Sequence, residues 1–196
     1  MLMRGREIMK YFTKEAYKNA LGSQEKMEQR SNEYQKYYKS IEHLIPKKLQ
    51  YALNLHENEL IKSGFVGKDF IIEFDPIHAS HAISPVTKLV FKNAVVLAND
   101  EPEVGSWTDV SEIYVEQGKY EIHILFSIFR NGSPLFRQII VQADDILFEE
   151  RFRNSGLCEK CGRVVSDPTK EEYEPRVYKG TFVNEKWFCE DCVKLS

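Results

Sequence analysis

Four cysteines near the end of the chain form two pairs with the same spacing. Two residues separate Cys158 from Cys161 and Cys189 from Cys192, and residues 162–188 lie between the pairs. A Cys-x-x-Cys turn directs two thiolates to one point, and two such turns complete a tetrahedral zinc site without an open coordination position. The spacing therefore predicts one structural zinc ion per chain, bound by all four thiolates.

The alternative for such pairs is redox chemistry, as dithiols or disulfides. Gly162 directly follows the first pair, where a metal-binding turn needs a residue that tolerates positive φ. A short C-terminal module buries little apolar surface, so a bound metal would supply the folding energy that it lacks. Because four thiolates fill the coordination sphere of zinc, we expect the ion to fold the module and not to catalyse a reaction.

A second group of residues with metal-binding or acid–base chemistry is Asp75, His78 and His81. Two histidines three residues apart beside a carboxylate could bind a transition metal or transfer protons. The alternative is a polar loop between strands with solvated histidines, which the flanking Pro76 and Pro85 favour.

Two further histidines are expected to have structural roles. His56 falls on the apolar face of an expected helix beside Glu57, which indicates a hydrogen-bonded histidine in the core or at a helix end. His123 lies in an alternating strand on the face opposite Ile122 and Ile124, where we expect it to be exposed or paired across the sheet. The sequence contains no phosphate-binding glycine loop, no Gly-x-Ser-x-Gly elbow and no His-Glu-x-x-His motif, so we expect a protein that is not an enzyme.

The first part of the chain has helical periodicity. Apolar residues recur at helical spacing from Thr13 to Ile45, with a kink or a boundary between two helices at Gly22-Ser23. Pro46 suits the first turn of a further helix that ends at Ser63-Gly64.

After Gly64 the period changes towards two, which is typical of strands. Short turns join the expected strands, so an antiparallel sheet is predicted. The expected strands are residues 65–74, 89–97, 113–116, 119–130, 135–142 and 146–152, with two more at 177–182 and 185–188 between the cysteine pairs.

Composition and charge limit the function. The 196 residues are 42% hydrophobic and 29% charged with a net charge of −3, as in a soluble globular protein. The chain has neither a membrane-spanning apolar run nor a secretory signal, so a cytoplasmic location is expected. The net charge is +4 for residues 1–58, −8 for residues 59–150 and +1 for residues 151–196. The acidic middle would repel a nucleic-acid backbone.

Several short segments resemble an uncharacterised bacterial family, catalogued as domain of unknown function 4085. The similar segments are residues 9–15 (MKYFTKE), 55–57 (LHE), 88–93 (KLVFKN), 119–125 (KYEIHIL) and 144–149 (DDILFE). The resemblance covers residues 9–152 and implies a start at Met9 and a Gram-positive, cytoplasmic setting. It implies no activity, and the cysteine module resembles an appended zinc ribbon.

These observations predict an α+β fold: N-terminal helices, then an antiparallel β-sheet domain, then a small four-cysteine zinc ribbon. The expected units are residues 1–8 (a non-native or disordered extension), 9–63 (helical), 64–153 (antiparallel β, one unit with the helices) and 154–196 (zinc ribbon).

The expected function is that of a non-enzymatic protein-interaction or adaptor protein, such as an immunity-type protein that neutralises a basic toxin. The first alternative is nucleic-acid binding through basic residues around the cysteines. The second is a metal-dependent hydrolase that uses Asp75, His78 and His81. The basic residues of the first alternative are Arg151, Arg153, Lys160, Arg163, Lys186 and Lys194.

Overall fold

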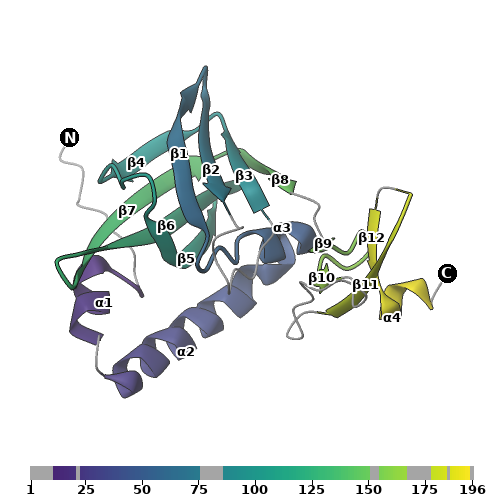
Figure 1. Cartoon of the computed structure of the whole chain (residues 1–196), viewed down its shortest axis with the longest axis horizontal. Helices are drawn as coiled ribbons and strands as arrows, with labels where there is room; N and C mark the ends of the chain where they lie inside the picture. Colours follow the sequence, from purple (N-terminus) through teal and green to yellow (C-terminus); the bar gives the residue numbers. More distant parts are fainter. Residues whose placement is uncertain are drawn as a thin grey trace.

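The computed structural model describes residues 11–20, 23–75, 86–150, 155–166, 178–184 and 186–194. Its parts are short N-terminal helices, a large antiparallel sheet and a small C-terminal module that lies beside α3 (Figure 1). The expected α+β fold is confirmed for the antiparallel sheet and the four-cysteine module. It is confirmed only in part for the helices, because most of them are short.

The large sheet has eight strands in the order β4-β7-β6-β5-β1-β2-β3-β8, and all neighbours are antiparallel. The strands are β1 (Glu59–Val66), β2 (Asp69–Asp75), β3 (Val86–Lys92), β4 (Val95–Asn99), β5 (Trp107–Glu116), β6 (Lys119–Arg130), β7 (Ser133–Ala143) and β8 (Asp145–Glu150).

The two ends of this strand order meet, because the strand pair β3–β8 bends at a corner and continues as the strand pair β4–β7. β3 continues as β4 after two residues, and β7 continues as β8 after one. Lys92 is opposite Asp145 before the corner, and Val95 is opposite Gln142 after it. Each chain segment passes through three residues between these two pairs, so the register is the same on both sides of the corner. Asn93 and Asp144 hold the corner through a side-chain hydrogen bond of 3.0 Å. The sheet therefore closes on itself.

The closure is narrow on the other side of the sheet. β1 and β5 pair as strands at a single position, Glu59 opposite Trp107, and a few backbone hydrogen bonds of residues 57–60 with residues 105–108 extend this contact. Beyond this point α2 lies beside β5, and the Tyr34 hydroxyl accepts the backbone N–H of Ile113 at 2.8 Å. A helix side chain thus satisfies a strand donor that no neighbouring strand reaches.

The helices supply the remaining walls of the core. They are α1 (Lys14–Ala20), α2 (Gln24–Ile41), the 3₁₀ turn η1 (Glu42–Leu44) and α3 (Lys47–Ala52). The break between α1 and α2 confirms the boundary expected near Gly22-Ser23. Ile41, Ile45 and Leu49 pack against the inner face of the sheet, where Phe70, Phe91 and Phe126 are among the fully buried side chains.

A second apolar cluster covers the outer face of β6. Leu125 and Phe136 of the sheet pack against Phe12 and Tyr34 of the N-terminal segment. Consequently residues 122–127 of β6 are buried on both faces.

The helix expected to run from Pro46 to Ser63-Gly64 is wrong after Ala52. Residues 53–58 form a turn bonded to β5, because the Ser111 hydroxyl donates to Leu53 O at 2.5 Å and the Asn58 N–H donates to Thr108 Oγ1 at 3.0 Å. Strand β1 then begins at Glu59, inside the stretch expected to be helical.

Two expected strands are divided by turns. The expected strand 65–74 contains the hairpin turn between Val66 and Asp69, and the expected strand 89–97 contains the corner at Asn93. Both interruptions include a residue with positive φ, Gly67 at 64° and Asn93 at 50°. Continuous apolar runs thus conceal the points where the chain changes direction.

The C-terminal module is a four-stranded sheet in the order β12-β11-β10-β9, with one parallel pair, β10 and β11. The strands expected at 177–182 and 185–188 are present as β11 and β12, within one residue. The elements are β9 (Ser155–Leu157), β10 (Val164–Ser166), β11 (Tyr178–Val183), β12 (Lys186–Cys189) and α4 (Glu190–Val193).

Candidate metal centre

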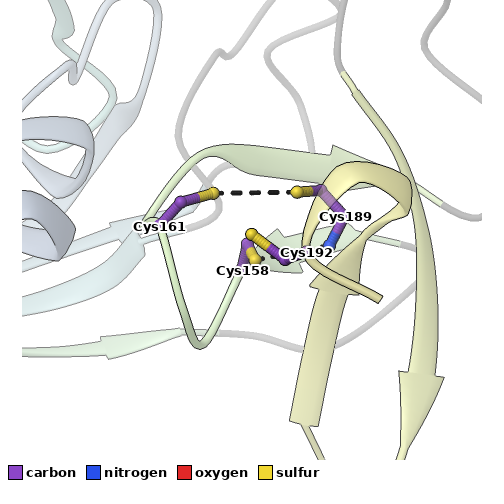
Figure 2. A group of neighbouring side chains, drawn as sticks. All are labelled: Cys158, Cys161, Cys189 and Cys192. Carbon is purple, nitrogen blue, oxygen red and sulfur yellow. Dashed lines mark hydrogen bonds between the residues drawn. The ribbon is translucent and has the colours of Figure 1, made fainter. Parts of the chain in front are cut away.

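The structure brings all four cysteines together. Their sulfur atoms lie within 4.8 Å of one another, and all four are free thiols (Figure 2). Cys161 Sγ and Cys189 Sγ are 3.7 Å apart. A tetrahedral zinc ion with Zn–S bonds of about 2.3 Å separates its sulfur ligands by about 3.8 Å. The measured separation therefore fits a four-thiolate metal site.

Two turns position the ligands. The first follows β9, and in it the Gly162 N–H donates to Cys158 O at 2.8 Å. The second joins β12 to α4, with Cys189 as the residue before the helix and Cys192 inside it. Two hydrogen bonds donated by backbone N–H groups tie the turns together, from Glu159 N–H to Trp187 O at 2.8 Å and from Cys189 N–H to Cys158 Sγ at 3.3 Å.

The electrostatics of the cluster favour a bound cation. Burial raises the pKa of Cys158, but three backbone N–H groups, led by that of Cys189, outweigh it and bring the pKa to about 6. The hydrogen bond with Cys189 raises the pKa of Cys192 to about 12. Cys158 thus loses its proton readily, whereas Cys192 keeps its proton. A bound divalent ion would stabilise the thiolate form of the remaining cysteines through its positive charge.

Gly162 places the first turn directly on α3. Its φ is +77°, as expected for the residue after a Cys-x-x-Cys pair. A Cβ at this position would also lie 2.9 Å from the carbonyl carbon and oxygen of Lys47 and from the backbone nitrogen of Lys48. The turn and the helix thus meet backbone to backbone.

Further contacts fix the module to the large sheet. Leu157 is 3% exposed and belongs to the main apolar core. Lys48 Nζ of α3 lies 2.6 Å from Glu159 Oε2 of the module. The metal centre is therefore attached to the core through β9 and to α3 through its own turn.

Three of the basic residues near the cysteines, Lys160, Arg163 and Lys186, have acceptors within the module. Arg163 pairs with Asp191 at 3.1 Å, and Lys160 donates to Cys192 O at 3.1 Å. Lys186 Nζ lies 3.6 Å from Glu159 Oε1. These cations stabilise the module itself, which leaves less positive charge for a phosphate backbone. Arg151 and Arg153 lie outside the described residues.

The other candidate residues have separate positions. Asp75 ends β2 opposite Glu59, while His78 and His81 lie outside the described residues. His56 belongs to the turn after α3, and its Nδ1 is 2.9 Å from Asp109 O. His123 is buried and pairs across the sheet with Glu112, and its Nε2 is 2.8 Å from Glu121 Oε1. The expected cross-strand pairing is confirmed, and exposure is not found.

Sequence analysis missed Asp109 and Glu112 of β5, which line a groove beside α2. The expected strand began at Ile113, so both carboxylates were outside it. The pairing of β5 with β6 places Glu112 opposite His123, the only histidine of β6. Aligning the two expected strands in this register would have indicated Glu112.

No family model, no curated protein and no solved structure matches this chain. The resemblance to the bacterial family stays a prediction. Within the described ranges, no helix has the length and apolarity required to cross a membrane.

Proposed function

We propose that this protein is a non-enzymatic protein-interaction protein whose C-terminal module is folded by one zinc ion. The observation that carries the proposal is the closed cluster of Cys158, Cys161, Cys189 and Cys192. Thiolates select soft metals, and a tetrahedral set of four is typical of structural zinc. Because all four positions are filled by protein, no position remains for a substrate or an activated water.

The docking of the module supports a structural role for the ion. Gly162 touches the backbone of α3, and Leu157 enters the main core. Zinc bound here would fix the surface that the module and α3 form together. A fixed surface lowers the ordering cost of binding a partner, so it suits recognition.

The charge of the large sheet indicates a basic partner. Residues 59–150 have a net charge of −8, and many of the cations among them are already paired with carboxylates. A surplus of carboxylates remains to attract a positively charged protein in the cytoplasm, such as a toxin bound by an immunity-type adaptor. The ion pairs are Lys62–Glu73, Lys88–Glu149, Lys92–Asp69, Lys119–Asp144 and Arg130–Glu103.

The first test is elemental analysis of the purified protein. We expect one zinc per chain, and loss of that zinc in Cys158→Ser. Thr181→Ala, an exposed change on β11, is the matched control and should keep the ion. A folded, metal-free module would contradict the zinc assignment.

The second test is capture of a partner from the producing cells, with the charge-reversal variant Glu101→Lys as the comparison. Glu101 is exposed in the acidic loop before β5. We expect the wild-type protein to retain a basic protein that the variant releases. Salt-sensitive retention of nucleic acid would favour the nucleic-acid alternative instead. Turnover lost in His78→Ala would favour the hydrolase alternative.

A further inference from the structure

A groove of about 540 Å³ lies between α2 and β5, away from the cysteine cluster. Ligand pockets in proteins commonly have volumes of about 300–1,000 Å³. Tyr34 and Tyr38 of α2 form one wall, Asp109 and Glu112 of β5 form the other, and Asn54 and His56 close one end. The described residues that line the groove include no lysine and no arginine, so its only fixed charges are negative.

Asp109 owes its position to an irregularity in β5. The register with β6 shifts between Thr108 and Val110, so Asp109 has no opposite residue. Such a bulge turns a side chain out of the regular alternation. The Ser127 hydroxyl hydrogen-bonds the carboxylate, but Asp109 Oδ2 is buried and has no hydrogen-bond partner in the part of the chain that the structure describes. Burial raises the pKa of Asp109, which reflects a carboxylate with too few donors.

Glu112 is the second carboxylate of the same wall and is 1% exposed. It accepts the Phe12 N–H at 2.8 Å and the Tyr114 hydroxyl, and His123 Nδ1 is 3.9 Å away. Burial raises the pKa of Glu112 in spite of these donors. Two carboxylates thus stand three residues apart in a half-enclosed space, and neither forms a short ion pair with a lysine or arginine of the described ranges.

Two oxygen atoms hold His56 at the groove's end. Its Nδ1 lies 2.9 Å from Asp109 O, a carbonyl that can only accept, so Nδ1 carries the proton. Its Nε2 lies 3.8 Å from Glu57 Oε1. What the groove offers to a ligand is therefore two carboxylates and two tyrosine rings, and both favour a cation.

We propose that this groove binds a small organic cation, an amine or guanidinium on an apolar body, with the cation at Asp109 and Glu112 and the body against Tyr34 and Tyr38. An ammonium or guanidinium group supplies the donor that Asp109 Oδ2 lacks and the positive charge that the wall lacks. The site is independent of the proposed zinc centre, and it accepts either a free small molecule or a side chain of a partner.

The test compares three probes with the same body: phenethylamine, phenethyl alcohol and phenylacetate. Binding to the full-length protein is followed by amide chemical shifts. We expect saturable shifts of residues 109–113 with the amine, and at least tenfold weaker binding of the alcohol and the acid. Equal binding of amine and alcohol, shifts elsewhere, or no binding of the amine would overturn the proposal.

Asp109→Asn keeps the shape of the side chain and removes its charge. We expect it to weaken amine binding at least tenfold, while Asp145→Asn, the same change at an exposed position of β8 outside the groove, leaves binding unchanged. Unchanged binding in folded Asp109→Asn would overturn the proposal. If that variant does not fold, the comparison of amine with alcohol on the wild-type protein decides the question.

The source of the cation is separated by one more pair of probes. Tighter binding of N-acetyl-arginine amide than of phenethylamine identifies a partner's side chain as the ligand, and the reverse identifies a free amine. Either order supports a cation site, and absence of both overturns it.

Discussion

Two separate constraints act on Gly162. Its positive φ strains any residue with a Cβ, and a Cβ would also meet the backbone of Lys47 at 2.9 Å. The first constraint is local to the turn. The second arises from the contact between the turn and α3. A substitution at Gly162 therefore tests both the geometry of the metal-binding turn and the contact of the module with α3.

We predict that Gly162→Ala lowers the free energy of unfolding by about 2–5 kcal/mol, from backbone strain and overpacking together. Gly118→Ala is the control, because Gly118 has a φ of +75° and nothing within 4 Å of the Cβ position. It should cost only the strain, about 1–2 kcal/mol. Urea denaturation measures both, and equal losses would show that α3 does not press on the turn.

The buried Glu112 carboxyl predicts a pH dependence. Its pKa is raised above 4.5 by burial, so the native state binds this proton more tightly than the unfolded chain does. Its contribution to stability is thus present below about pH 4.5 and lost as pH rises through the native pKa. His123 and Glu121 face the same cluster.

We therefore predict that Glu112→Gln, relative to wild type, is more stable at pH 7 than at pH 4.5. Urea denaturation at the two values provides the measurement. Glu101→Gln, on an exposed loop, should show the same difference from wild type at both. A variant that gains nothing at pH 7 would mean that the donors to Glu112 fully offset its burial.

At the scale of elements, β9 joins the module to the core. Its last residue, Leu157, is buried in the main cluster, while the nearby Lys48–Glu159 pair is part-exposed. Apolar burial of this kind outweighs an exposed ion pair, which contributes about 0–1 kcal/mol.

We predict that Leu157→Ala costs about 2–5 kcal/mol and Lys48→Ala less than about 1 kcal/mol. The variants are made in a Trp107→Phe background so that Trp187 is the remaining tryptophan. Denaturation followed separately by Trp187 fluorescence and by far-UV circular dichroism then reports on the module and on the whole chain. If the module is joined to the core as described, Leu157→Ala shifts both signals. A shift in fluorescence alone would show that the large sheet does not depend on β9.

Local patterns predicted most strands but not the helix-to-strand change before β1. Leu49, Leu53 and Leu60 have spacings compatible with one helical face, and all three are buried. What ends the helix is distant in sequence: the hydroxyls of Ser111 and Thr108 bond the backbone of residues 53–58. The hydrophobic periodicity of a segment contains no information about partners that are distant in sequence.

The cysteine cluster was predictable because its information is local. Two Cys-x-x-Cys turns specify their geometry wherever the chain brings them together. The groove at Asp109 was not predictable, because it depends on a bulge in β5 and on α2 crossing the sheet. To predict a site formed by elements that are distant in sequence, one must know the register between the strands, and the sequence alone does not give it.

For the molecule as a whole, removal of the ion should affect more than the module. We predict that a strong zinc chelator lowers the midpoint of thermal unfolding and shifts the amide resonances of Lys47 and Lys48, which contact Gly162. Readdition of zinc should restore both. Chelation that changes only residues 155–194 would show that the two parts are energetically independent.

The single pairing of β1 with β5 has a consequence for aggregation. Leu60 bonds to the backbone of Gly105 and Ser106, but among the described residues β1 beyond Leu60 pairs only with β2. The other edge of that part of β1 therefore offers unused backbone donors and acceptors. The exposed Phe65 and Val66 at its end add the apolar surface on which a strand from another copy could nucleate an assembly. Lys62, with 65% of its side chain exposed, places a charge on this edge and acts as a gatekeeper against such growth.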